Sequence, residues 1–241
     1  MSSDGPGPNS TDARGGPPDP GESAAGRAGS VEFGADRWAV VVPVKSPERG
    51  KSRLDASGVD RRELARAIAL DTIAATAACD AVAQVYVVTD DAQLPLHAHD
   101  IPGLRFVPES DGARGLNGAI ATGAARAGER MPRAALLGDV PALRPADLAA
   151  ALHVAAFVDR GVVADTEGTG STLVTARAGV AWDTAFGTDS FERHRALGCE
   201  PLDVAPESTL RRDVDTADQL RAAAAQGLGP RTAALVRELV R

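Results

Sequence analysis

The chain has 241 residues, a formal net charge of −7 and only 3 % aromatic residues. This balance disfavours a nucleic-acid-binding protein, which needs a basic surface and aromatic side chains for stacking. No apolar run is long enough to span a bilayer, and the N-terminus lacks the apolar segment of a signal peptide. Cys79 and Cys199 lie far apart and form no CxxC pair, so neither a disulfide framework nor a cysteine zinc site is expected. We expect a cytoplasmic protein with neither nucleic acid nor a membrane among its partners.

The first 36 residues are dense in Gly, Pro, Ser and Asp and show almost no apolar periodicity. Such a segment cannot bury enough surface to offset the conformational entropy that it would lose on ordering. We therefore predict a disordered Gly/Pro-rich tail over residues 1–36 and a single folded domain over residues 37–241.

From residue 37 onward, short apolar runs alternate with helical patterns. The first run, WAVVVPV (38–44), is nearly all apolar, as expected for a strand that is buried on both faces. Further strands are predicted at 84–90, 104–108, 134–140, 161–165 and 171–176. Helices are predicted at 59–78, 117–130, 145–158, 190–197 and 216–225, and from 230 onward. This alternation predicts an α/β fold with a mostly parallel central sheet and helices on both faces.

The predicted first strand leads into a segment that holds Lys45 and Lys51, the only two lysines in the chain. Ligands bind at the carboxyl ends of strands in such sheets, so this position favours phosphate binding. GKS at 50–52 matches the end of a Walker A loop, but a lysine stands where the first glycine of that motif belongs. The alternatives are a phosphate clamp built from the lysines and Arg53, or a plain solvated charged loop.

Three aspartates follow or flank predicted elements in a way that favours a metal site. Asp139 leaves the strand 134–140 after an apolar run, and a carboxylate at that place suits a hard metal ion. Asp213 and Asp215 lie two residues apart, so an extended backbone places both carboxylates on one face. Like charges so close are unfavourable without a cation. The alternative is that Asp215 or Thr216 caps the following helix.

Three glycine-containing turns, GARGLNGAI, GTGST and FGTDSFERHR, offer hydroxyls and backbone amides for ligand binding. In the third turn, Ser190 and the first amides of the following helix predict an anion site. That helix also carries Arg193 and His194, and a lone histidine is more often structural than catalytic. No cysteine or serine nucleophile adjoins an obvious base, so a covalent mechanism is not expected.

Six motifs over residues 38–241 resemble, in order, the phosphoenolpyruvate and 2-phospho-L-lactate guanylyltransferases, called FbiD in bacteria and CofC in archaea. The motifs are PVK…GKSRL, GLNGAI, GDVPAL, GTGSTL, FGTDSFERH and DVDT. The resemblance implies a three-layer Rossmann-like nucleotidyltransferase fold and a role in coenzyme F-420 biosynthesis. It also implies Mg²⁺, expected as two ions, GTP and phosphoenolpyruvate as substrates, and a downstream deazaflavin transferase as a partner.

The resemblance further implies roles for sixteen residues of this chain. The implied metal ligands are Asp139, Asp213 and Asp215. The implied catalytic side chains, which face the triphosphate, are Lys45, Lys51 and Arg53. The implied nucleotide contacts are Pro43, Leu116, Asn117 and Gly138. The implied acceptor contacts are Thr169, Ser171, Thr172, Gly187, Ser190 and Arg193. Where the family often reads GTGT this chain reads GTGS, and Ser171 keeps the hydroxyl.

In the implied reaction, the acceptor's phosphate oxygen attacks the α-phosphorus of GTP, and pyrophosphate leaves. That oxygen is already ionised, so positioning and charge neutralisation suffice. One alternative is a molybdopterin guanylyltransferase or a sugar-phosphate cytidylyltransferase, which usually carry a GGxGxR loop where this chain reads VKSPERGKSR. Another is a non-catalytic nucleotide-binding module, which has no need of three aspartates. The acceptor alternatives are 2-phospho-L-lactate and 3-phosphoglycerate; a composition typical of GC-rich bacteria favours phosphoenolpyruvate.

Overall fold

The structure is a computed structural model that describes residues 37–46, 59–110 and 115–237. These residues belong to one compact unit. The tail predicted at 1–36 lies outside them, as do Lys51 and Arg53. The division of the chain at residue 36 therefore stays a prediction.

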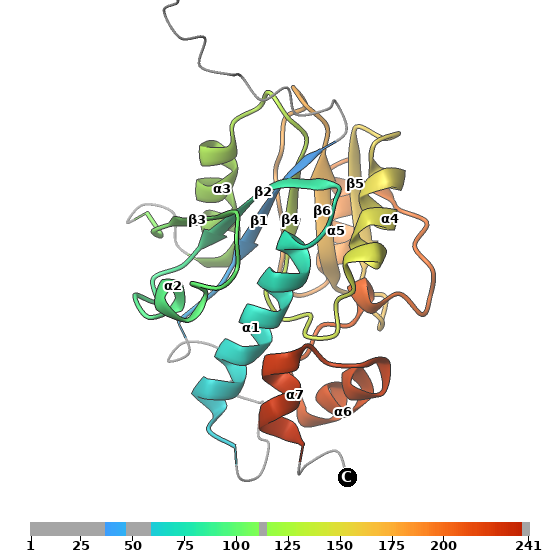
Figure 1. The fold of residues 1–241 in the computed structure, drawn as a ribbon. Helices are drawn as coiled ribbons and strands as arrows, with labels where there is room; N and C mark the ends of the chain where they lie inside the picture. Colours follow the sequence, from blue (N-terminus) through green and yellow to red (C-terminus); the bar gives the residue numbers. More distant parts are fainter. Residues whose placement is uncertain (1–36, 47–58, 111–114, 238–241) are drawn as a thin grey trace, which may run out of the picture. The chain divides into compact units, whose positions relative to one another are not determined.

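Within the described residues, seven strands form one sheet in the order β3-β2-β1-β4-β6-β5-β7 (Figure 1). The strands are β1 (Trp38–Pro43), β2 (Val82–Val88), β3 (Leu104–Val107), β4 (Arg133–Leu136), β5 (Arg160–Ala164), β6 (Ser171–Ala176) and β7 (Glu200–Pro201). All neighbouring pairs are parallel except those of β6, which runs antiparallel to both β4 and β5. The prediction of a mostly parallel α/β sheet is confirmed.

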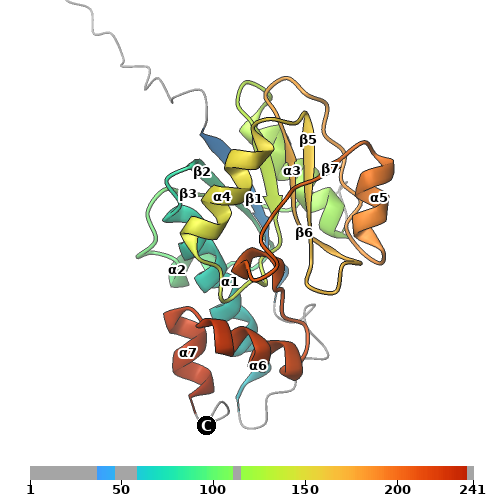
Figure 2. The same cartoon turned by 90° about the vertical axis from the view of Figure 1, so that its right-hand side faces the viewer.

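The inner strand β1 is buried on both faces, and alternate residues along it belong to different apolar clusters. Helices lie on both sides of the sheet (Figure 2). Val40 and Val42 pack in the same cluster as α1 (Arg61–Ala77) and α4 (Pro145–Ala155). Val41 packs in a cluster with α3 (Gly115–Ala127) on the opposite face. α5 (Ser190–Ala196) packs against β5 and β6. The helices thus cover both faces of the sheet, as the sequence pattern predicts.

The chain ends with α6 (Ala217–Gln226) and α7 (Pro230–Val236), which pack against the first half of α1. Leu64 of α1 clusters there with Leu220 and Val236. Asp71 of α1 also accepts hydrogen bonds from the backbone N–H groups of Arg231 and Thr232, at 3.2 and 2.7 Å. The segment before α6 contacts the loop after β4, where the N–H of Val214 donates to the carbonyl of Asp139.

The prediction of a strand over 134–140 is wrong at its C-terminal end, because β4 ends at Leu136. The chain turns out of the sheet there, since the backbone N–H of Val140 donates to Thr72 Oγ1 on α1 at 3.1 Å instead of to a neighbouring strand. The sequence pattern also missed three short elements. They are α2 (Leu94–His97), β7 and a 3₁₀ turn at Thr209–Arg211.

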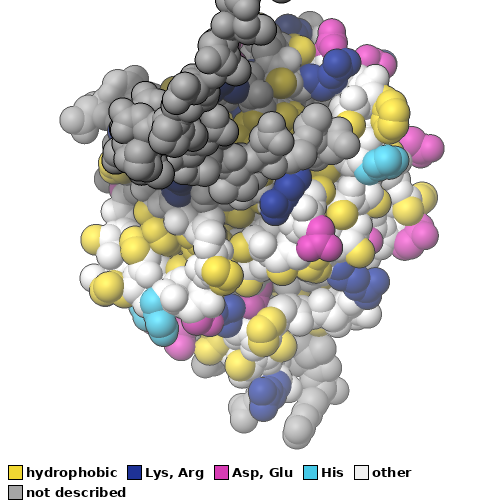
Figure 3. Space-filling view, turned by 45° about the horizontal axis from the view of Figure 1, so that its top comes forward, with side chains coloured by type: hydrophobic (Ala, Val, Ile, Leu, Met, Phe, Trp, Pro, Cys, Tyr) yellow, Lys and Arg dark blue, Asp and Glu magenta, His cyan; other side chains and the backbone are white. Residues whose placement is uncertain are grey.

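Among the helices that the structure describes, none is long and apolar enough to cross a membrane. On the face shown in Figure 3, acidic and basic side chains are interspersed with apolar ones in the part of the surface that is described.

Candidate active site

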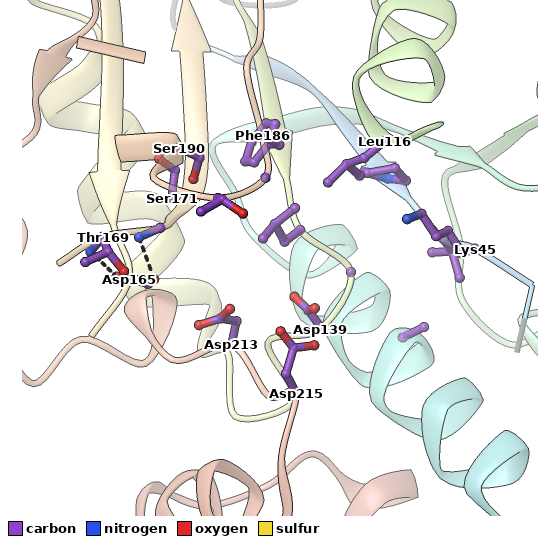
Figure 4. Close-up of a pocket in the computed structure, with 18 of the residues that line it drawn as sticks. Lys45, Leu116, Asp139, Asp165, Thr169, Ser171, Phe186, Ser190, Asp213 and Asp215 are labelled. Carbon is purple, nitrogen blue, oxygen red and sulfur yellow. Dashed lines mark hydrogen bonds between the residues drawn. The ribbon is translucent and has the colours of Figure 1, made fainter. Parts of the chain in front are cut away.

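The carboxyl ends of β1, β4 and β5 border a cavity of about 700 Å³, a size typical of small-molecule sites. Because β6 runs in the opposite direction, its first residue, Ser171, reaches the same edge of the sheet. Figure 4 shows Lys45 and Leu116 on one side of the cavity and Thr169, Ser171 and Ser190 on the other. Three aspartates lie between these two sides.

Most of the predicted site residues that the structure describes line this cavity. They are Pro43, Lys45, Leu116, Gly138, Asp139, Thr169, Ser171, Gly187, Ser190, Asp213 and Asp215. Asn117, Thr172 and Arg193 are not among its lining residues. Thr172 is fully buried in β6, and Arg193 is exposed on α5. The structure therefore brings the predicted metal, phosphate and acceptor residues together from six separate segments.

A backbone contact joins the acidic residues across a long stretch of sequence. The N–H of Val214 donates to the carbonyl of Asp139 at 2.9 Å. Val214 is fully buried, so its neighbours Asp213 and Asp215 turn toward the cavity. The two-residue spacing thus places both carboxylates on one face, as predicted. Thr216 also caps α6, so the alternative interpretation of this segment holds beside it.

The negative charge of this cluster affects the pKa of Asp213. Burial, reinforced by the nearby carboxylates of Asp139, Asp165 and Asp215, raises the pKa of Asp213 to about 7. A bound cation would relieve this repulsion. Oxygen atoms of Asp165, Glu167 and Asp213 lie within 4.8 Å of one another, and this group shares only Asp213 with the predicted metal ligands. Because every donor is a carboxylate oxygen, the cluster fits a hard divalent cation.

Asp165 was missed by the sequence prediction, although a signal was present. It is the last residue of the strand predicted at 161–165, and so it occupies the same edge of the sheet as Asp139. Its carboxylate accepts the backbone N–H groups of Thr169 and Gly170, at 3.0 and 2.7 Å. A Cβ at position 170 would collide with that carboxylate, so a larger residue there would displace the Asp165 side chain from these hydrogen bonds. Asp165 therefore shapes the turn that presents Ser171.

The side chain of Asn117 forms hydrogen bonds with the segment before Gly187. Its amide oxygen accepts the backbone N–H of Phe186 at 2.8 Å and the hydroxyl of Thr184 at 3.0 Å. Its amide nitrogen donates to the carbonyl of Phe186 at 3.0 Å. These three bonds fix the loop that carries Gly187 and Ser190 into the cavity. The predicted contact between Asn117 and the nucleotide base stays a prediction.

His194 is fully buried behind the acceptor side of the cavity. Its Nε2 accepts the backbone N–H of Ala185 at 2.8 Å, and its Nδ1 lies 3.0 Å from Ser171 Oγ. Burial, together with the smaller effect of the nearby charge of Arg193, lowers the pKa of His194 to about 4. The ring is therefore neutral in the folded protein at ordinary pH and is part of the architecture, as the sequence prediction favours.

One of the backbone amides predicted to form an anion site at the start of α5 already has an acceptor within the protein. The backbone N–H of Phe191 donates to the carbonyl of Thr169 at 3.1 Å. This amide is therefore used to join α5 to the turn before β6. Ser190 itself is buried and lines the cavity.

Comparisons with known proteins identify the family of the chain and agree with its fold. Residues 38–231 match the family model described as "Guanylyl transferase CofC like". A phosphoenolpyruvate guanylyltransferase of Thermomonospora curvata is 49 % identical over 204 residues, which cover 82 % of this chain and 88 % of the relative. Another, from Streptomyces scabiei, is 46 % identical, with 85 % of this chain and 98 % of the relative covered. A solved nucleotidyl transferase from Methanothermobacter has the same fold, with a TM-score of 0.54 at 18 % identity, over 80 % of this chain and 98 % of its own.

Proposed function

The chain belongs to the CofC-like guanylyl transferase family, and on that premise we propose that it transfers GMP from GTP to phosphoenolpyruvate. The bond that forms joins a phosphate oxygen of phosphoenolpyruvate to the α-phosphorus of GTP. The bond that breaks joins the α-phosphorus to the bridging oxygen, so pyrophosphate leaves with that oxygen. The product is enolpyruvoyl-2-diphospho-5'-guanosine, which a downstream deazaflavin transferase would consume in coenzyme F-420 biosynthesis.

The observation that carries this proposal is the convergence of three aspartates opposite a hydroxyl-rich wall in one cavity. We propose that Asp139, Asp213 and Asp215 hold Mg²⁺, as two ions. Bound there, Mg²⁺ supplies positive charge that offsets the charge of the phosphates. The raised pKa of Asp213 supports this assignment, because burial, and after it the neighbouring carboxylates, disfavour its ionised form when no cation is bound.

The remaining lining residues divide between the two substrates. Lys45, which is exposed beside the end of β1, would pair with the triphosphate. Lys51 and Arg53 would join it from the segment after β1. Pro43, Leu116 and Gly138 would contact the nucleotide, and Asn117 would contribute from behind them.

The acceptor would lie against the opposite wall, formed by the turn before β6 and the start of α5. Ser171 and Ser190 offer hydroxyls there, and Thr169 and Gly187 also line the cavity. Thr172 and Arg193 would assist from outside the lining. The acceptor's phosphate is ionised before it binds, so its oxygen attacks without losing a proton to the protein. Holding the two substrates in line is then the main task of these residues.

The test is pyrophosphate release from GTP and Mg²⁺, with phosphoenolpyruvate, 2-phospho-L-lactate or 3-phosphoglycerate supplied in turn. Each reaction is run with and without the deazaflavin transferase, because removal of the product favours turnover. We expect release with phosphoenolpyruvate, and none when CTP replaces GTP. Release with only one of the other two acids would assign a different acceptor to the same reaction. Release with none of the three, while calorimetry still shows GTP binding, would indicate a nucleotide-binding module.

A further inference from the structure

The hydrogen bonds of His194 define which ring nitrogen carries the proton. A backbone N–H can only donate, and that of Ala185 points at Nε2 at 2.8 Å. Nε2 must therefore present a lone pair. In a neutral imidazole the proton then sits on the other nitrogen, Nδ1.

The proton on Nδ1 sets the direction of the next hydrogen bond. Nδ1 lies 3.0 Å from Ser171 Oγ, so the ring donates and the hydroxyl oxygen accepts. The hydroxyl hydrogen of Ser171 cannot point back at the ring and is left for a different acceptor. Ser171 lines the cavity, on the wall that we assign to the acceptor substrate.

We propose that His194 is a positioning residue that makes the Ser171 hydroxyl a hydrogen-bond donor to an anionic oxygen of the acceptor substrate. That oxygen belongs to a phosphate or a carboxylate, since both are pure acceptors when ionised. The proposal rests on the proposed function, because the acceptor wall is assigned there. It gives the buried histidine a role in substrate binding through Ser171, without contact between the ring and the substrate.

The surroundings of the ring hold it in this orientation. His194 is fully buried, and Phe186 packs edge-on against it with ring centroids 4.7 Å apart. The bond from Phe191 N–H to the carbonyl of Thr169 ties α5 to the turn before Ser171. A second proton on Nε2 would face the N–H of Ala185, so the charged ring is opposed by geometry as well as by burial.

The first test reads the tautomer directly, in the whole protein and without substrate. The chain has four histidines, and the other three are exposed. A long-range ¹H–¹⁵N spectrum of ¹⁵N-labelled protein separates the two neutral tautomers by the shifts of the ring nitrogens. We expect one histidine with the proton on Nδ1 and no change from pH 5.5 to pH 8. His194→Gln or His194→Asn, whichever folds, identifies the signal by removing it. A proton on Nε2 of His194 would overturn the proposal.

The second test compares two replacements of His194 that restore different halves of its hydrogen bonding. In His194→Asn, the amide nitrogen falls near the position of Nδ1 and can still donate to Ser171. In His194→Gln, the amide oxygen falls near the position of Nε2 and satisfies only the N–H of Ala185. We expect His194→Gln to raise KM for the acceptor by about 10-fold to 100-fold with KM for GTP unchanged. We expect His194→Asn to recover most of that loss.

A double variant separates positioning from mere structure. If His194 acts through Ser171, then His194→Gln should change KM for the acceptor by less than about twofold when Ser171→Ala is already present. Effects that multiply in the double variant, or a matching rise in KM for GTP, would overturn the proposal. If wild-type protein turned over none of the three acids, the proposed function would fail, while the tautomer measurement would still decide whether the ring donates to Ser171.

Discussion

The acceptor wall and the adjacent group of Asp139, Asp213 and Asp215, called the acidic wall from here on, treat buried charge in opposite ways. On the acceptor wall, the carboxylate of Asp165 accepts two backbone N–H groups, and His194 is satisfied on both nitrogens. On the acidic wall, Asp213 is partly buried, and burial, reinforced by the charges of Asp139, Asp215 and the facing Asp165, raises its pKa to about 7. The first arrangement stabilises the fold by itself. The second is unfavourable until a cation arrives, which marks the part of the site that is built for a ligand rather than for stability.

The most severe test of this contrast is Asp213→Asn. We expect turnover to fall by at least about 100-fold, because a charged group of the proposed metal site is lost. We also expect the metal-free protein to melt at a higher temperature, because the amide removes one of the repelling charges. Steady-state pyrophosphate release and thermal melting measure the two effects. Asp203→Asn, at an exposed aspartate away from the cavity, is the matched control and should change neither. A lower melting temperature for Asp213→Asn would contradict the proposed difference between the two walls.

The same substitution on the other wall should act in the opposite direction on stability. Asp165→Asn leaves one amide oxygen for two backbone N–H groups, so the N–H of Thr169 or Gly170 loses its partner. We expect the free energy of unfolding to fall by about 1–3 kcal/mol, because the lost hydrogen bond outweighs the relief of the repulsion between Asp165 and Asp213. We also expect KM for the acceptor to rise by about 10-fold, because the turn before Ser171 loosens. Chemical denaturation and acceptor titrations at saturating GTP check this. An increase in stability would show that Asp165 belongs with the acidic wall instead.

Asn117 tests whether the loop before Gly187 serves one substrate or both. Asn117→Ala removes three hydrogen bonds to that loop. If the residue acts only through the loop, we expect KM for the acceptor to rise by about 10-fold with KM for GTP unchanged. Thr184→Val removes one of the three bonds and should give a smaller change of the same kind. A rise in KM for GTP confined to Asn117→Ala would instead support the predicted contact with the base.

The smallest expected effect is a dependence of stability on pH in the absence of metal. The pKa of Asp213 is raised from 3.8 to about 7 in the folded protein, so the folded state binds the proton more tightly than the unfolded state does. Its contribution to stability is therefore present below pH 4 and is lost as the pH rises to about 7. Between pH 5 and pH 8 we expect this group to lower the melting temperature by roughly 2–6 °C.

Three arms make that measurement specific. Scanning fluorimetry of the metal-free protein gives the slope of the melting temperature against pH. Saturating Mg²⁺ should flatten it, because a bound cation holds the carboxylate ionised and competes with the proton. Asp213→Asn should also flatten it. The same slope in wild type and in Asp213→Asn would assign the dependence to other groups.

The sequence by itself determined most of the helices and strands and several of the residues that line the cavity. The apolar run 38–44, buried on both faces, and the alternation after it predict the α/β sheet, because side-chain periodicity is a local property of the chain. The two-residue spacing of Asp213 and Asp215 likewise predicts a shared face. The six motifs, in their order along the chain, indicated the reaction through the family that they resemble.

Only the tertiary structure decided how these pieces meet. The reversed direction of β6 brings Ser171 to the edge where parallel strands end, and periodicity carries no information on strand direction. Asp165 joins the cavity through the register of β5 and β6. His194 acquires its tautomer from Ala185, nine residues earlier in the chain. Such roles depend on which donors and acceptors the packed chain brings within 3 Å, and those contacts form between elements rather than within them.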